Sequence, residues 1–151
     1  KPHGCMTLAS IPPDVANAYD AFPAPARERL MHLRGLVFVV AESLNVGKLT
    51  ETLKWGEPAY LTAPRIGSTI RLGWKRKQPD HAAIFLNCQT TLIGDFRATF
   101  SDELTFQGNR AILVPLENPP PDTILSLCFG AALTYHRDKR QKPRPILNAE
   151  Q

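Results

Sequence analysis

The sequence predicts a single α+β domain, in which an antiparallel sheet is covered on one face by helices. Apolar residues recur every three or four positions in residues 25–44, which is the helical period. Apolar and polar residues alternate in residues 68–75 and 81–88, as is typical of strands. The short turn between these strands favours antiparallel pairing, because a parallel pair needs a long crossover. A chain of 151 residues fits one such domain.

The first elements are predicted to be helical. A short helix is expected from Asp14, a candidate N-cap, to Ala21, because prolines bracket this segment. A second helix is expected from Pro25 to Leu44. Its second half is apolar on nearly all sides, which indicates burial, and Gly47 is expected to end the segment.

Residues 68–75 and 81–88 are predicted to be neighbouring strands. Alternation places Arg71 and Phe85 on the second face of this sheet, which is therefore only partly apolar. Tyr60 is expected on the same face. A sheet face with aromatic groups and an arginine is a candidate ligand surface, or alternatively the contact of a homodimer.

A short helix, a hairpin and a final helix complete the prediction. The short helix is expected at residues 91–99, and the hairpin at residues 104–116, with its turn at residues 107–109. The final helix is expected to start at residue 122 or 123 and to run through His136, because its apolar residues share one face.

The charge distribution separates a basic tail from a neutral body. The net charge is +4, and residues 136–144 carry five bases against one acid, so this segment alone accounts for the excess. We therefore expect a domain at residues 14–136, an N-terminal extension at residues 1–13 and a basic, flexible tail at residues 137–151. A neutral body lacks the basic stripe of a broad nucleic-acid-binding face, so nucleic acid is not an expected partner of the body.

Three cysteines at wide spacings argue against a disulfide framework and predict a reducing, cytoplasmic location. No apolar run approaches the roughly 20 residues of a membrane span, and no secretory signal is expected at the start of the sequence. Cys88 precedes the predicted helix at residues 91–99, which makes it either a reactive thiol or an inert one.

The common catalytic signatures G-x-S-x-G, H-E-x-x-H and C-x-x-C are absent from the sequence, so no catalytic residue is assigned. The four histidines show no metal-ligand spacing, and no metal site is assigned either. These patterns favour a binding protein over an enzyme.

Residues 52–62, TLKWGEPAYLT, concentrate candidate binding groups. Trp55 and Tyr60 carry rings that either contact a ligand or fill the core with their polar tips hydrogen-bonded. Glu57 is a candidate acid or metal ligand. Alternatively, it caps a backbone donor or pairs with Lys54.

Three arginines extend this candidate site. Arg71, Arg97 and Arg110 lie beside apolar residues, where a guanidinium needs a carboxylate or a bound anion. One alternative is a set of internal salt bridges, and the other is a cluster that selects an anionic small molecule. The candidate internal partners are Glu51, Glu57 and Asp95.

Several segments resemble the YdhG-like domain of unknown function family (domain of unknown function 1801). They are ETLKWGEPAYL, GSTIRLGW, HAAIFLNCQTTLIGDFR, QGNRAILV and AALTYH, and the resemblance covers residues 19–136. The most specific piece is KWGEPAY, because the Trp-Gly-x-Pro-x-Tyr order is unusual. The resemblance implies a compact α+β fold, a cytoplasmic bacterial setting and, for most members, no established activity. Some relatives are described as frataxin-like iron chaperones.

These observations lead to three hypotheses. The first is a binding protein that holds a small anionic or aromatic molecule between residues 54–60 and the exposed sheet face, with no cofactor. Its expected ligand-binding residues are Lys54, Trp55, Glu57, Tyr60, Arg71, Phe85, Arg97 and Arg110. The second, implied by the resemblance, is iron binding or delivery. The third is a nucleic-acid accessory role that uses the basic tail.

Overall fold

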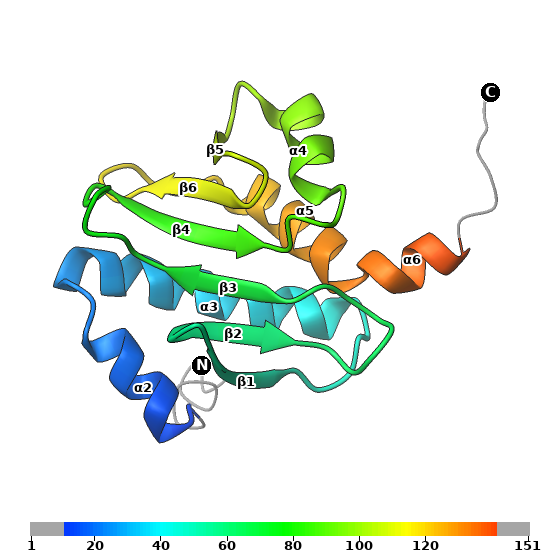
Figure 1. The fold of residues 1–151 in the computed structure, drawn as a ribbon, viewed down its shortest axis with the longest axis horizontal. Coiled ribbons are helices and arrows are strands. Elements are labelled where there is room, and N and C mark those ends of the chain that lie inside the picture. The colour runs from blue at the N-terminus through cyan, green and yellow to red at the C-terminus, as the bar shows by residue number, and fades with distance from the viewer. Residues whose placement is uncertain (1–10, 142–151) are drawn as a thin grey trace.

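The computed structural model describes residues 11–141, which form a six-stranded sheet with helices packed behind it (Figure 1). The helices are α2 (Pro13–Asp20), α3 (Ala24–Ser43), α4 (Leu92–Phe100), α5 (Asp122–Leu133) and α6 (Tyr135–Gln141). The strands are β1 (Thr50–Lys54), β2 (Glu57–Leu61), β3 (Ile70–Gly73), β4 (His81–Leu86), β5 (Thr105–Gln107) and β6 (Ala111–Pro115). Their order is β1-β2-β3-β4-β6-β5, and every neighbouring pair is antiparallel. The predicted α+β class is confirmed.

The main core lies between the sheet and the two long helices α3 and α5, which run behind the strands (Figure 1). Leu33 and Val37 of α3 and Leu125 of α5 are fully buried there, together with Ile70 and Ile84 of the sheet. Each such side chain stabilises the fold by about 1.5–3 kcal/mol relative to an exposed position. This layer covers one side of the sheet. We call the opposite side, which α3 and α5 do not cover, the open face.

A buried polar network joins α2 and α3 to the β1–β2 hairpin. The Arg34 guanidinium donates two hydrogen bonds to the Glu51 carboxylate, at 2.6 and 2.8 Å. The Tyr60 hydroxyl donates to the same carboxylate at 2.8 Å, and the Tyr19 hydroxyl lies 2.5 Å from that of Tyr60. Burial raises the pKa of both tyrosines well above the usual range, so both hydroxyls stay protonated.

The loop between β2 and β3 packs against the junction of α5 and α6. A Cβ on Gly67 would lie 2.2 Å from the carbonyl oxygen of Leu133, so the loop approaches the helix at a distance that only glycine allows. The Ile66 carbonyl accepts hydrogen bonds from the backbone N–H groups of His136 and Arg137, both at 2.9 Å. The helix predicted to run unbroken through His136 is therefore divided in two at this contact.

Other boundaries also differ from the prediction. The N-cap of α2 is Pro12, and Asp14 lies inside the first turn, where its carboxylate accepts from the Val15 N–H at 2.8 Å. Residues 50–61, for which we predicted no strands, form the β1–β2 hairpin. The expected end of the domain at residue 136 falls within α6, and residues 142–151 of the predicted tail lie outside the described part of the chain.

In the part of the chain that the structure describes, the helices are all too short or too polar to cross a bilayer.

Replacing Glu51 tests the buried network. We expect Glu51→Gln to destabilise the fold by about 3 kcal/mol, because Arg34 would keep a buried charge without its carboxylate partner. Urea denaturation followed by circular dichroism measures the change. Glu28→Gln, which neutralises an exposed carboxylate on α3, is the matched control and should change stability by less than about 0.5 kcal/mol. Equal effects of the two substitutions would contradict the anchoring role of the network.

The two buried tyrosines predict a loss of stability in alkali. Their pKa values are raised in the folded state, mainly by desolvation, whereas a tyrosine of the unfolded chain titrates near about pH 10. Their contribution is therefore fully present below about pH 10 and is lost as the pH rises further, at roughly 1.4 kcal/mol per pH unit for each tyrosine. Urea denaturation between about pH 8 and pH 11 should show Tyr19→Phe losing stability less steeply than the wild-type protein. Parallel profiles would refute this assignment.

Candidate functional site

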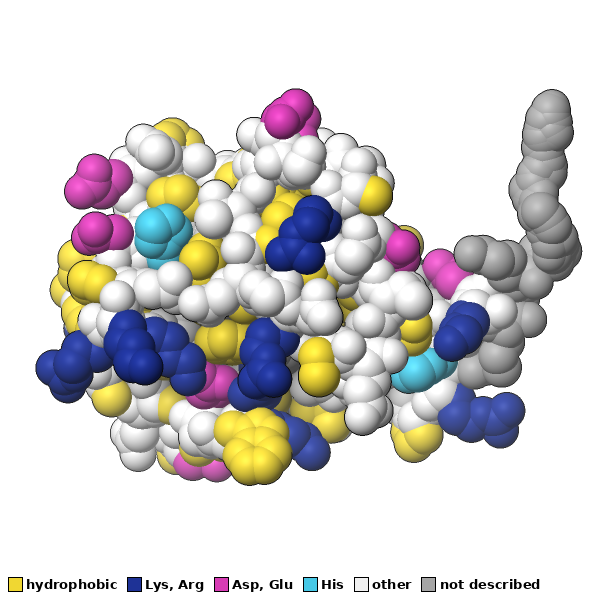
Figure 2. All heavy atoms as spheres, turned by 45° about the horizontal axis from the view of Figure 1, so that its top comes forward, with side chains coloured by type: hydrophobic (Ala, Val, Ile, Leu, Met, Phe, Trp, Pro, Cys, Tyr) yellow, Lys and Arg dark blue, Asp and Glu magenta, His cyan; other side chains and the backbone are white. Residues whose placement is uncertain are grey.

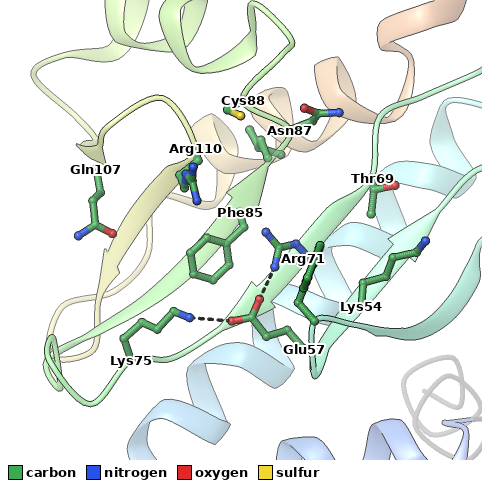
Figure 3. Close-up of a pocket in the computed structure, with 12 residues that line it drawn as sticks. Lys54, Glu57, Thr69, Arg71, Lys75, Phe85, Asn87, Cys88, Gln107 and Arg110 are labelled. Carbon is green, nitrogen blue, oxygen red and sulfur yellow. Dashed lines mark hydrogen bonds and ion pairs between the residues drawn. The ribbon is translucent and has the colours of Figure 1, made fainter.

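The open face carries a pocket of about 680 Å³ near its centre. Its lining comes from the β1–β2 hairpin, from β3 and β4, and from the β5–β6 hairpin, so strands distant in sequence meet there (Figure 3). Most of the side chains labelled in Figure 3 are polar or charged, and Phe85 lies among them. The pocket is therefore a hollow on the sheet with a mixed lining rather than an apolar cavity.

The charges around the pocket are predominantly positive. Lys54, Arg71, Lys75 and Arg110 line it with a single carboxylate, Glu57, so four cations minus one anion leave an excess of three positive charges. Figure 2 shows Lys and Arg side chains gathered across this face of the molecule, with an acidic group between them. The body of the protein is close to neutral in total, but this part of its surface is basic.

Glu57 is held by two of the four cations. Its carboxylate accepts a hydrogen bond from Arg71 at 2.6 Å and lies 3.3 Å from Nζ of Lys75 (Figure 3). In contrast, Lys54 and Arg110 form no ion pair with any residue in the range 11–141. In one half of the pocket two cations thus share a single carboxylate, and the other half presents cations to solvent.

The floor of the pocket is built around Phe85. The guanidinium carbon of Arg71 lies 5.1 Å from the centre of its ring, and Nζ of Lys75 lies 5.3 Å from it. A Cβ on Gly73 would lie 2.8 Å from Oε2 of Glu57 and 3.1 Å from Cε2 of Phe85. The missing side chain at Gly73 therefore makes the space in which the carboxylate and the ring lie side by side.

Trp55 lies at the tip of the β1–β2 hairpin, on the rim of the pocket. Lys54 lies opposite Glu57 in the backbone register of β1 and β2, so the turn between them consists of Trp55 and Gly56. The φ values of these two residues are +57° and +79°. These values are those of a type I′ turn, in which Asn-Gly is the preferred pair. A left-handed backbone costs a residue with a side chain roughly 1–2 kcal/mol. Trp55 is 89% exposed, so burial does not offset that cost.

Six of the eight residues predicted to bind a ligand line this one pocket. They are Lys54, Trp55, Glu57, Arg71, Phe85 and Arg110. The internal salt bridge predicted as an alternative for Arg71 is also present, with Glu57 as its partner. The proposed ion pair between the side chains of Glu57 and Lys54 is not found, because the Glu57 carboxylate turns toward Arg71 and Lys75 instead.

The other two predicted residues lie elsewhere. The expectation that Tyr60 faces the open side is wrong: it pairs with Ile70 in the sheet register, and its fully buried side chain points into the core. Arg97 lies on α4 and is not part of the lining. It donates a hydrogen bond to the Gly108 carbonyl at 2.8 Å and lies over the ring of Phe106.

Sequence reasoning missed several residues of the lining. Lys75 follows Arg71 by four positions, and Asn87 follows Phe85 by two, so continuing the strand alternation would have found both. No pattern in the sequence indicated Gln107, because β5 reaches the pocket only through its pairing with β6.

The two cysteines of the described region differ in environment. Cys88 is exposed and lines the pocket, and its reactivity stays a prediction. Cys128 is buried in α5, where desolvation raises the pKa of its thiol to about 12. Among residues 11–141, no three or more His, Cys, Asp or Glu side chains form a group that could hold a metal ion.

Comparison of the chain with protein-family models, with curated proteins and with solved structures gives no match. The resemblance to the YdhG-like family, and the iron-binding alternative that it implies, stay predictions.

Filling the space above Gly73 should disturb the pocket floor. We expect Gly73→Ala to destabilise the protein by about 1–2 kcal/mol, because the new methyl group would contact both Glu57 and Phe85. Gly35→Ala is the matched control: its Cβ would meet no atom within 4 Å, and alanine should stabilise the interior of α3 by about 0.5–1 kcal/mol. Urea denaturation compares the two, and effects of the same sign would argue against the packing described here.

Proposed function

We propose that the protein binds a small anionic ligand in the open-face pocket. The observation that carries this proposal is the excess of three positive charges around one hollow. A cleft lined by charges of one sign concentrates its field and attracts the opposite charge. An anion in the pocket would relieve the repulsion between these cations.

The part of the pocket without a carboxylate supports this ligand class. Lys54 and Arg110 have no ion pair among the described residues, and Arg110 can present its planar donors to a carboxylate or a phosphate. Asn87 and Gln107 add amide groups to the same lining. The volume of about 680 Å³ is within the range of small-molecule sites.

Glu57 has a specific role in this proposal. Its carboxylate already occupies Arg71 and Lys75, so it acts as an internal anion that competes with the ligand for these two cations. A ligand with more than one negative charge would gain most, since it can contact Lys54 and Arg110 and also draw the other cations away from Glu57.

Titration calorimetry with inorganic pyrophosphate tests the proposal. We expect Arg110→Gln to weaken binding about tenfold, because one charge-assisted hydrogen bond is lost. Lys139→Gln removes a positive charge from α6, away from the pocket, and should leave the affinity unchanged. Equal losses in the two variants would indicate attraction by net charge alone and would contradict a defined site. Absence of binding to pyrophosphate, phosphate and citrate would reject the proposal.

The same titration with Glu57→Gln should show tighter binding, because removal of the internal anion frees Arg71 and Lys75. A loss of affinity in Glu57→Gln would show instead that the carboxylate helps to form the site.

A further inference from the structure

The tryptophan at the hairpin tip has no structural explanation. It occupies a left-handed position in a two-residue turn that asparagine fills with less strain, and most of its ring surface is open to solvent. Residues in such conformations cluster at active sites and ligand-binding sites. The position of Trp55 on the rim of a basic pocket suggests what that function is.

The two aromatic residues of the lining differ in how much of their ring surface a ligand can contact. Phe85 is 6% exposed, and its ring already lies beside Arg71 and Lys75. Trp55 is exposed on the rim, next to Lys54 in the chain. The pocket thus combines a free indole surface with cations that have no partner in residues 11–141, and a matching ligand carries a flat ring as well as a negative charge.

We infer that the anion recognised by this pocket is a nucleotide, with its base stacked on Trp55 and its phosphate held by Arg110 and Lys54. This inference rests on the proposed anion-binding function and specifies its ligand class. Stacking of bases on exposed aromatic side chains beside a basic groove is a general mode of recognition, and it applies to free nucleotides and to single strands alike. Lys75 leads into Arg76 and Lys77, which extend the basic surface beyond the pocket along the β3–β4 turn.

The experiment uses Trp55 as its own reporter. The chain has two tryptophans, and Trp74 lies outside the pocket lining, with its indole N–H donating to the Pro79 carbonyl at 3.1 Å. In a Trp74→Phe background, adenosine 5′-monophosphate and a ten-nucleotide single strand of thymidylates are titrated against the fluorescence of Trp55. Ribose 5-phosphate, which has a phosphate and no base, is the matched ligand control. We expect quenching by a base-containing ligand and binding about tenfold tighter than that of ribose 5-phosphate.

The decisive variant is Trp55→Asn, whose binding is followed by calorimetry. Asparagine suits the turn, so the melting temperature should be unchanged or higher, which separates a loss of binding from a loss of folding. We expect the variant to bind the base-containing ligand about tenfold more weakly and to bind ribose 5-phosphate as the wild-type protein does. Preference for the monophosphate identifies a free nucleotide as the ligand, and preference for the oligonucleotide identifies a single strand.

Two outcomes would overturn the inference. The first is that ribose 5-phosphate and the base-containing ligands bind with equal affinity. The second is that Trp55→Asn binds nucleotide as the wild-type protein does. Either would leave the anion site itself intact. Failure of all these ligands and of pyrophosphate to bind would instead reject the proposed function together with the inference.

Discussion

The ion pair between Arg34 and Glu51 is the contact on which the pocket depends. A guanidinium buried in α3 is tolerated because the Glu51 carboxylate faces it with two hydrogen bonds, and Tyr60 completes that carboxylate's contacts. The β1–β2 hairpin lies at the edge of the sheet, and a two-stranded ribbon has little stability of its own. With Glu51 and Tyr60 fixed on the core side, alternation turns Lys54 and Glu57 to the open face. The same register therefore places Glu51 in the core and turns Lys54 and Glu57 toward the pocket.

Small residues give the open face its shape. Ala83 and Ala111 form a buried cluster with Phe85 and Leu113 on this side of the sheet, and Gly73 lies beside them in β3. Their short side chains let the long ones from the surrounding strands rise around a hollow. The core side, in contrast, is filled by larger side chains against α3 and α5. A difference in residue volume between the two faces thus accounts for a packed layer on one side and a pocket on the other.

Local patterns predicted much of the fold and part of the site. The helical period and the strand alternation are local signals, so the class of fold and the side of the sheet that carries Arg71 and Phe85 followed from them. The face of Tyr60 depends on its pairing with Ile70, which local alternation does not reveal. Pro58 also masked the hairpin, since proline is uncommon in strands, and the turn has Trp55 where Asn or Asp is usual before the glycine.

The basic character of the pocket could not be predicted from the sequence, for a related reason. Total charge describes the whole chain, whereas the cations of the pocket come from three separate regions of the sequence, at residues 54, 71–75 and 110. Antiparallel pairing brings these regions together around one carboxylate, that of Glu57. A neutral body is therefore compatible with a strongly basic patch, and only the order of the strands shows it.

The contact between the β2–β3 loop and the α5–α6 junction has a consequence for synthesis of the chain. The Ile66 carbonyl and Gly67 take their final places against residues 133–137, which leave the ribosome much later than the loop does. Until residues 133–137 have emerged, this loop lacks its contact, and the part of the core against α5 stays incomplete. Such long-range closure slows folding and exposes a nascent chain to aggregation.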